Sequence, residues 1–226
     1  MKKQAVLAAF RDTVPVMTGY LFLGFGFGIL LHQNGYGLGW ALAMSLFLYA
    51  GSMQYVCIGL MTGGASLLTT ALTALMVNAR HLFYGLSMVD SYKGAGRRKP
   101  YLIFALTDET YSLVSREPRR DHRYCFLVSL FDQIYWVAGS ALGSLAGSLV
   151  PLNYEGIDFV LTALFVTIFV EQWLSTRGHG PAILGVAATC VCLLLFGQDL
   201  FLIPSMAAIA AVLIVRSGRE RRQENV

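Results

Sequence analysis

The sequence Asn78-Ala79-Arg80-His81 places an amide, an arginine and an imidazole in the middle of an otherwise apolar stretch. Because a fixed positive charge is costly in apolar surroundings, this arginine has to face protein or a hydrated cavity. Its planar donor fork suits a carboxylate, either of a side chain or of a bound substrate. On a helix Arg80 would share a face with Tyr84, and Asn78 with His81. The pattern therefore predicts a structural ion pair or an anion site.

Acids that could pair with this arginine occur at three other places. Thr107-Asp108-Glu109 puts two adjacent carboxylates, about 100° apart on a helix, at the centre of an apolar stretch. One could pair with Arg80 while the other faces a cavity and carries a proton. Asp132 and Glu171 each precede a glutamine near the end of an apolar stretch, where an acid can also reach the interface. The predicted coupling or ion-pair residues are Asp108, Glu109, His81, Asp132 and Glu171.

A third polar group, Tyr49-Ala50-Gly51-Ser52-Met53-Gln54, interrupts an earlier apolar stretch. Gly51 and Ser52 could break a helix there and free backbone groups for a ligand. His81 could relay protons beside the acids, although a histidine satisfied within the core explains its position as simply. The predicted substrate-binding residues are Arg80, Asn78, Gly51, Ser52, Gln54, Tyr49 and Tyr84.

Seven apolar segments carry these residues, at about 14–32, 39–62, 66–89, 124–150, 157–174, 182–197 and 199–215. Apolar stretches of about 17–25 residues match the roughly 30 Å hydrocarbon core of a bilayer. An eighth segment, 100–115, carries Asp108 and Glu109 at its centre, and we expect it to be broken, re-entrant or interfacial. The chain is 56% hydrophobic and 13% charged, about half the charged fraction of a soluble domain. The predicted fold is all-α and polytopic, a bundle of about 7–8 transmembrane or partly broken helices.

The basic residues gather in the hydrophilic loops and termini, at 2–11, 93–99, 116–123 and 216–222. This is the distribution that the positive-inside rule predicts for cytoplasmic segments. Cytoplasmic termini and a cytoplasmic 116–123 loop suit the last four segments. In the first half, three full crossings would put the 93–99 loop outside, against the rule. Either one early segment turns back, or this loop is an exception.

The whole chain, 1–226, is predicted to form one integral membrane domain that ends in a basic cytoplasmic tail, 216–226. Residues 45–55 (SLFLYAGSMQY) align without gaps on 163–173 (ALFVTIFVEQW), which would make about 14–115 and 124–215 repeat halves. Chance explains so short a match equally well. Glycines four residues apart let helices approach closely; their simpler interpretation is helix packing, and the alternatives are a docked subunit or a substrate path. These glycines are Gly24 and Gly28, and Gly139, Gly143 and Gly147.

No cofactor or metal site is expected from the sequence. All four cysteines lie in apolar segments, and Cys190 and Cys192 are about 200° apart on a helix, so they cannot share one ligand face. The sequence contains no P-loop, His-Glu-x-x-His motif, nucleophile elbow or dinucleotide fingerprint. Energy from ATP hydrolysis would therefore have to come from another subunit. An intramembrane enzyme built on His81 and Asp108 lacks an evident nucleophile, so no enzyme activity is expected.

Three of these motifs together resemble one family. The runs Tyr49-Ala50-Gly51-Ser52-Met53-Gln54, Asn78-Ala79-Arg80-His81 and Leu106-Thr107-Asp108-Glu109 look like those of the AzlC family, the large subunit of bacterial branched-chain amino acid exporters. Pro15 and the glycine-rich first segment also fit, whereas the second half matches mainly in hydropathy. The resemblance implies export of leucine, isoleucine and valine, with methionine as a further candidate, across the bacterial inner membrane. It also implies a small AzlD-type membrane subunit as partner.

The residues and the resemblance together lead to the hypothesis of a secondary exporter for zwitterionic aliphatic amino acids. Arg80, with Asn78 and the backbone near Gly51, would bind the substrate carboxylate. Asp108 or Glu109 would take the ammonium group or a coupling proton, and neighbouring apolar side chains would accept the branched tail. Three alternatives stay open: an uncoupled channel or facilitator, an intramembrane enzyme, and a scaffold whose partner carries the substrate path.

Overall fold

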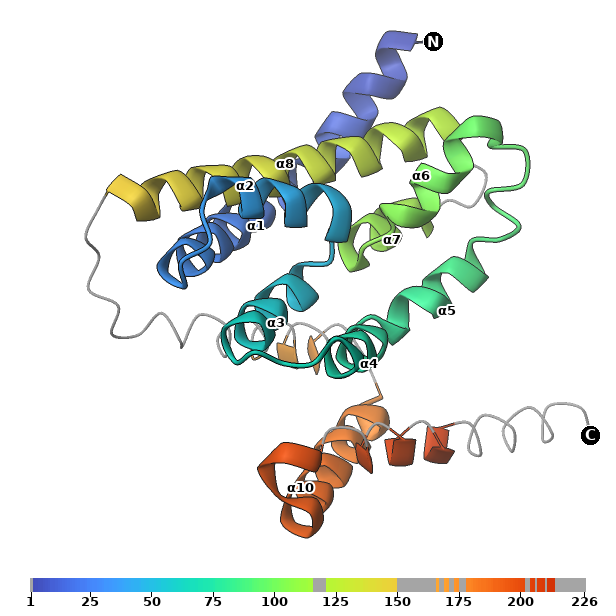
Figure 1. The fold of residues 1–226 in the computed structure, drawn as a ribbon. Coiled ribbons are helices and arrows are strands. Elements are labelled where there is room, and N and C mark those ends of the chain that lie inside the picture. Colours follow the sequence, from blue (N-terminus) through green and yellow to red (C-terminus); the bar gives the residue numbers. More distant parts are fainter. Residues whose placement is uncertain are drawn as a thin grey trace, which may run out of the picture. The chain divides into compact units, whose positions relative to one another are not determined.

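The computed structural model describes residues 2–115, 121–149, 178–201 and several short stretches between 166 and 213. These residues form helices and no strands, so the all-α membrane fold predicted from the sequence is confirmed (Figure 1). Three of the described helical stretches are long and apolar enough to cross a bilayer, Gln4–Gln33, His122–Leu149 and Gly180–Gly197. The chain divides into two compact units, Met1–Leu161 and Thr162–Val226.

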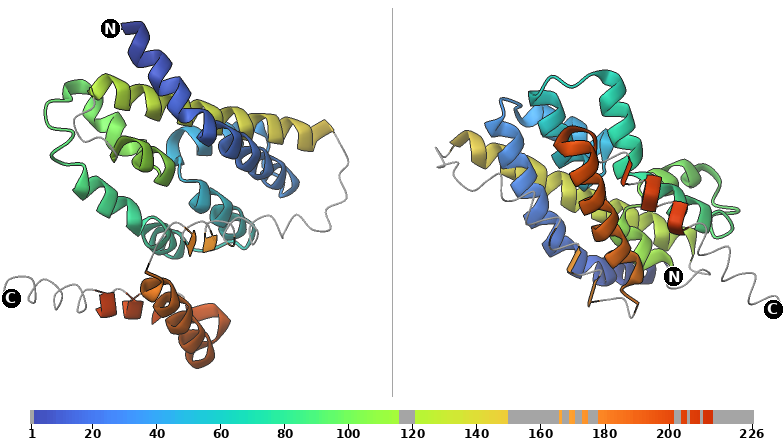
Figure 2. Two further views of the ribbon diagram at one scale, coloured as in Figure 1. Left: turned by 180° about the vertical axis from the view of Figure 1, so that it is seen from behind. Right: turned by 90° about the horizontal axis from the view of Figure 1, so that it is seen from below.

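Two long helices form the centre of the first unit. α1 (Lys2–Gln33) and α8 (His122–Leu149) pack against each other and run in the same direction (Figures 1 and 2). Near their amino-terminal ends, Tyr124 donates a hydrogen bond of 2.6 Å to Asp12. Near their carboxyl-terminal ends, His32 lies against Gly147. We call the end of the unit where both helices begin the basic end, and the other the opposite end.

Glycine permits the close approach of α1 and α8. A Cβ atom on Gly24 would lie 2.9 Å from the carbonyl oxygen of Trp136, which is too close for any larger side chain. A Cβ atom on Gly28 or on Gly143 would lie closer still to the backbone of the facing helix. The structure therefore supports the simpler of the interpretations given for these glycines, which is that they let two helices pack closely.

Three helical segments between α1 and α8 are each broken near their middle. α2 (Leu38–Ala43) continues as the π-helix η1 (Met44–Leu48), and α3 (Gly51–Thr62) follows after Tyr49 and Ala50. α4 (Leu67–Val77) and α5 (Ala79–Ser87) meet at Asn78. The short 3-10 helix η2 (Gly96–Arg98) leads into α6 (Lys99–Phe104), which is separated from α7 (Asp108–Ser115) by residues 105–107. The predicted segments 39–62 and 66–89 are thus each two helices, and 100–115 is broken as expected.

Local residues explain two of the breaks. Tyr49 adopts a left-handed backbone conformation (φ 36°, ψ 47°), which is uncommon outside glycine, and Ala50 is extended. The break therefore lies immediately before Gly51 and Ser52, where the sequence placed it. At the third break, Thr107 Oγ1 accepts a hydrogen bond of 3.3 Å from the backbone N–H of Thr110, which caps the start of α7.

The segment α6–α7 is a hairpin that turns back halfway along α8. At its start, the Arg98 guanidinium lies 5.7 Å from the ring centre of Phe126, near the beginning of α8. Tyr101 then donates a hydrogen bond of 2.7 Å to Gln133, at the middle of α8. On the return, Val114 joins a buried cluster with Tyr124, so α7 ends where α6 began. The segment 100–115 is therefore re-entrant, one of the forms expected from its acids.

The loop between α5 and α6 lies at the basic end. The His122 ring is hydrogen-bonded to the carbonyl oxygen of Ser91 at 3.0 Å, and Tyr92 is buried in one cluster with Ala9 and Tyr124. Because α1 ends at the opposite end, the two broken segments between it and this loop make one net crossing. One early segment therefore turns back, and the basic 93–99 loop is no exception to the charge distribution.

The segment that turns back is α2–α3. Gly51, at its break, lies against the indole ring of Trp136 at the middle of α8. One turn later, Tyr55 donates a hydrogen bond of 2.7 Å to the carbonyl oxygen of Leu23 and packs on Phe27, further toward the opposite end. The crossing consequently belongs to α4–α5, which leads into the 88–99 loop (Figure 1).

The second unit contains α10 (Gly180–Leu200), the helix predicted at 182–197. Its backbone is kinked at Gly197, where φ is 73°. Most of the predicted segments 157–174 and 199–215, the tail 216–226 and Glu171 lie outside the described residues. The internal repeat and the single-domain organisation therefore stay predictions.

Candidate functional site

An ion pair lies where the three broken segments meet. Arg80, the second residue of α5, places its Nη2 atom 3.0 Å from Oδ2 of Asp108, the first residue of α7. The structure thus pairs the deep arginine with one of the acids expected as its partner. The side chains are 31% and 32% exposed, so the pair is open on one side instead of being sealed in the core.

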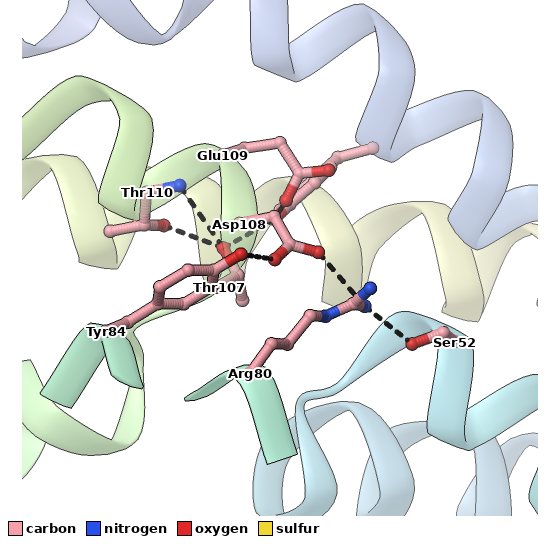
Figure 3. A network of polar contacts seen from close by, with 8 residues as sticks. Ser52, Arg80, Tyr84, Thr107, Asp108, Glu109 and Thr110 are labelled. Carbon is pink, nitrogen blue, oxygen red and sulfur yellow. Dashed lines mark hydrogen bonds and ion pairs between the residues drawn. The ribbon is translucent and has the colours of Figure 1, made fainter. Parts of the chain in front are cut away.

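Two further side chains complete this site, which we call the Arg80 centre: Ser52, Arg80, Tyr84 and Asp108 (Figure 3). Arg80 Nη2 donates a hydrogen bond of 2.9 Å to Ser52 Oγ in the first turn of α3. The Tyr84 hydroxyl donates one of 2.7 Å to Asp108 Oδ1. Each break of a helical segment thus contributes to one cluster, and every residue in it was predicted from the sequence.

The Arg80 centre presents a positive and a negative group side by side. The first N–H groups of α3 point out of the helix near Ser52, and no side chain caps them at Ala50. These N–H groups and the Arg80 guanidinium favour an anion. Asp108 favours a cation. A molecule that carries both charges on neighbouring atoms matches this arrangement.

A chain of hydroxyl groups lies next to the Arg80 centre, and Figure 3 labels three of its residues, Thr107, Glu109 and Thr110. It begins at Glu109, beside Asp108, whose Oε2 accepts a hydrogen bond of 2.6 Å from Tyr20 of α1. Tyr20 is 2.7 Å from Thr107 Oγ1, which is 3.0 Å from Thr110 Oγ1. Thr110 ends the chain 2.8 Å from Oδ2 of Asp132 on α8. We call these five residues the hydroxyl chain.

The middle of α8 holds the breaks in place. Trp136 donates a hydrogen bond of 2.7 Å from its indole nitrogen to Gln54 Oε1, and Gln54 Nε2 donates one of 3.3 Å to Ser45. Gln133 donates from Nε2 to the carbonyl oxygen of Leu46. Gln54 is fully buried, so it ties α3 to η1 and α8 and is not among the residues of the Arg80 centre.

The other predicted residues lie around the site in different ways. Asn78 forms the break between α4 and α5, and His81 packs edge-on against Tyr84, with ring centres 5.9 Å apart. Tyr49 is buried, with its ring 6.2 Å from that of Phe104. Gly51 packs so closely against Trp136 that a Cβ atom at this position would lie 2.9 Å from the indole ring.

Sequence reasoning missed several residues of the site. Tyr20, Thr110 and Trp136 were not singled out, although each makes a buried or partly buried hydrogen bond. One signal was present for Trp136: it is four residues after Asp132 and therefore on the same face of α8. Hydroxyl groups such as that of Thr110 are too frequent in apolar helices to carry a signal of their own.

The family model described as AzlC protein matches residues 15–150, from α1 to the end of α8. The chain belongs to the AzlC family. It is 41% identical over 234 residues to the "Branched-chain amino acid transport protein AzlC" of Bacillus subtilis (strain 168), covering 100% of this chain and 92% of the relative. The matched range includes the Arg80 centre and the hydroxyl chain.

Other relatives of this AzlC-family protein are membrane proteins. One of Helicobacter pylori (strain ATCC 700392 / 26695) is 42% identical over 211 residues, covering 92% of each chain. The "Inner membrane protein YgaZ" of Escherichia coli (strain K12) is 26% identical over 209 residues, covering 89% of this chain and 84% of the relative. No solved structure matches the chain.

Proposed function

We propose that this AzlC-family protein is a secondary transporter that exports branched-chain amino acids from the cytoplasm together with a small AzlD-type membrane subunit. Leucine, isoleucine and valine are the proposed substrates, with methionine as a further one. The name of the Bacillus subtilis relative supports the substrate class. The observation that carries the proposal is the partly exposed pair of Arg80 and Asp108 where three broken segments meet.

The pair offers one partner for each charge of an amino acid. The substrate carboxylate displaces Asp108 from the Arg80 guanidinium, whose two donor nitrogens suit a carboxylate. The ammonium group then replaces Arg80 beside Asp108. Ser52 and the uncapped start of α3 lie next to the guanidinium and add hydrogen-bond donors for the carboxylate. The site exchanges one ion pair for two, so no charge is left without a partner.

The arrangement of the broken segments suits alternating access. One hairpin, α2–α3, enters from the opposite end, and the other, α6–α7, enters from the basic end. Both reach the middle of α8, as expected for a transporter whose site lies between two gates near the membrane centre. The positive-inside rule assigns the basic end to the cytoplasm. Export would then carry the substrate from the α6–α7 side to the α2–α3 side.

The proposed partner has an apolar surface available. No residue of α4 is buried within the described part of the chain, and Leu67, Leu68 and Leu75 are among its exposed side chains. In lipid such a helix can pack against another membrane subunit. If that subunit instead carries the substrate path, substitutions in the partner, and none in the Arg80 centre, would change substrate preference.

Efflux of preloaded radiolabelled leucine, from cells lacking their own exporters, tests the proposal. The chain is expressed with and without its partner, and as Arg80→Ala and Arg80→Lys. We expect partner-dependent efflux that Arg80→Ala abolishes, because Asp108 then loses its counter-charge and the carboxylate its donor. Arg80→Lys keeps the charge but not the planar fork, and should retain a small fraction of the efflux.

Arg97→Ala is the matched control, because this exposed arginine lies in the basic loop away from the Arg80 centre. It should export at the wild-type rate at equal membrane levels. Near-normal efflux by a well-inserted Arg80→Ala protein would refute the binding site. Efflux that ignores an imposed proton gradient would favour an uncoupled facilitator over a secondary transporter.

A further inference from the structure

Four short contacts join the carboxyl groups of Glu109 and Asp132 through the three hydroxyl groups of Tyr20, Thr107 and Thr110. Their oxygen–oxygen distances are 2.6, 2.7, 3.0 and 2.8 Å along the chain from Glu109 to Asp132. All four fall in the range of O–H···O hydrogen bonds. Each contact therefore needs one hydrogen between its two oxygens.

The hydroxyl groups alone cannot supply these hydrogens. Three hydroxyls carry three hydrogens, one fewer than the number of contacts. With both carboxyls ionised, Tyr20 would donate to Glu109, and Thr107 would donate toward Asp132 through Thr110. The oxygens of Tyr20 and Thr107 would then face each other at 2.7 Å with no hydrogen between them. The fourth hydrogen has to come from one of the two carboxyl groups.

We infer that Glu109 and Asp132 together bind one exchangeable proton, which the three hydroxyls pass from one carboxyl to the other. With the proton on Asp132, every hydroxyl donates toward Glu109; with the proton on Glu109, every hydroxyl donates toward Asp132. In the transfer, each hydroxyl oxygen gives up one hydrogen and receives another. The net result is one O–H bond broken at the first carboxyl and one formed at the second, with no charge left on a hydroxyl.

The surroundings of Asp132 favour a shared proton over two carboxylates. Asp132 is fully buried, and its Oδ1 has no hydrogen-bond partner among the described residues. An ionised carboxylate is costly in such a place. The ionisable groups that face it are Glu109 of α7, Tyr20 of α1, Tyr49 at the end of η1 and Tyr101 of α6. None of these is a cation, whereas Glu109 faces Asp108 and the Arg80 guanidinium, which favours the state with the proton on Asp132. Tyr49 would bring its own hydrogen to any contact with Tyr20, so the number of missing hydrogens stays at one.

The hydroxyl chain connects this proton to the Arg80 centre. Glu109 directly follows Asp108 at the start of α7, so a substrate that displaces Arg80 from Asp108 acts on the turn that holds one end of the chain. The proton on Glu109 and Asp132 is then the one that exchanges for the exported amino acid. This coupling role rests on the proposed function, whereas the binding of the proton does not.

Infrared spectroscopy of the purified full-length protein tests the proton site without any substrate. At neutral pH, we expect the C=O stretch of a protonated carboxyl group, shifted in D₂O. Asp132→Asn and Glu109→Gln should each abolish it alone, because the introduced amide donates the missing fourth hydrogen and leaves the other carboxyl ionised. Absence of the band in the wild type, or a band that either substitution leaves unchanged, overturns the shared proton.

Tyr135→Phe is the matched control for these spectra. Tyr135 lies on α8 close to Asp132, but its hydroxyl contacts Thr13 and not the hydroxyl chain. The band should persist in this variant. Tyr20→Phe, in contrast, removes two of the four contacts and breaks the chain between Glu109 and Thr107. The two carboxyl groups should then bind protons independently, so that Glu109→Gln and Asp132→Asn no longer each abolish the band alone. If each substitution still abolishes the band in Tyr20→Phe, the role of the chain is overturned.

Vesicles that contain the protein and its partner test the coupling. A pH gradient should drive leucine flux in the wild type, and Asp132→Asn should lose this flux while it keeps leucine–leucine exchange, which needs no net proton movement. Gradient-driven flux that Asp132→Asn leaves intact overturns the coupling role. If wild-type vesicles show neither flux nor exchange of leucine, the proposed substrate is wrong, and the infrared result still decides on the proton site.

Discussion

At the scale of single residues, the Arg80 centre depends on one tyrosine that holds Asp108 in place. Tyr84 donates to Asp108 Oδ1 at 2.7 Å, while Arg80 approaches the other oxygen, Oδ2. Tyr84 itself stacks on Tyr111, with ring centres 4.4 Å apart. The carboxylate is therefore oriented before any substrate binds, which lowers the cost of binding an ammonium group.

Tyr84→Phe should weaken substrate binding without abolishing insertion. A hydrogen bond to a charged group contributes about 1.5–3 kcal/mol, so its loss should raise the half-saturating leucine concentration by about tenfold or more. Concentration-dependent efflux measures this change. Tyr111→Phe is the control, because the Tyr111 hydroxyl contacts Ser87 and not Asp108. Equal effects of both substitutions would contradict a specific role of the hydrogen bond to Asp108, because both variants keep the stacked rings.

A second prediction at the scale of single residues concerns the hydrogen bond between Trp136 and Gln54. Gln54→Leu leaves the buried indole N–H without an acceptor and should lower the free energy of unfolding by about 1–3 kcal/mol. Trp136→Phe combined with Gln54→Leu removes both partners and should recover part of this loss. Thermal unfolding in detergent measures the cycle. Additive losses in the double variant would show that the hydrogen bond of 2.7 Å contributes nothing specific.

Charge was readable from the sequence at this scale, and hydrogen-bond geometry was not. A charge inside an apolar segment is costly enough that a partner can be inferred, and Arg80 indeed pairs with Asp108. Gln54 also stood out as polar, but its partners could not be told from its spacing, and they are Ser45 and Trp136. Tyr20 is one hydroxyl in a long apolar helix, and its role depends on a fold that brings α7 beside α1.

At the scale of elements, glycine spacing predicted which faces pack, whereas the breaks were only partly predictable. Gly28 and Gly143 face each other's helix backbone as their spacing indicated. The break beside Gly51 had a local signal in glycine and serine. The break at Asn78 had no such signal, because residues 67–84 contain neither proline nor glycine. Asn78 itself has φ −94° and ψ 5°, outside the helical range.

Gly143→Val should separate α1 from α8. The added side chain would overlap the backbone at Phe25, and overpacking of this kind typically costs about 1–3 kcal/mol. We expect a lower unfolding temperature in detergent and less protein in the membrane. Gly19→Val is the control, because a Cβ atom at Gly19 of α1 meets nothing within 4 Å. A Gly143→Val protein as stable as Gly19→Val would contradict the close packing of the two helices.

At the scale of the whole first unit, the two hairpins place the described basic loops at one end. The sequence alone left open whether an early segment turns back or the 93–99 loop breaks the charge rule. Hydropathy could not decide, because α2–α3 and α4–α5 are both long and apolar enough as continuous segments. Contacts far apart in sequence decide it: His122 with Ser91, and Tyr55 with Leu23.

Labelling of single cysteines with a membrane-impermeant maleimide tests this topology, in a chain whose four native cysteines are replaced. Lys93→Cys and Asp121→Cys should react from the same side of the membrane, because both loops lie at the basic end. Asn34→Cys, in the loop after α1, should react only from the other side. If the basic end is cytoplasmic, Lys93→Cys and Asp121→Cys should also react in inverted vesicles and not in intact cells. Opposite sides for Lys93→Cys and Asp121→Cys would mean that α6–α7 crosses the membrane, and the two facing hairpins that frame the Arg80 centre would then not exist.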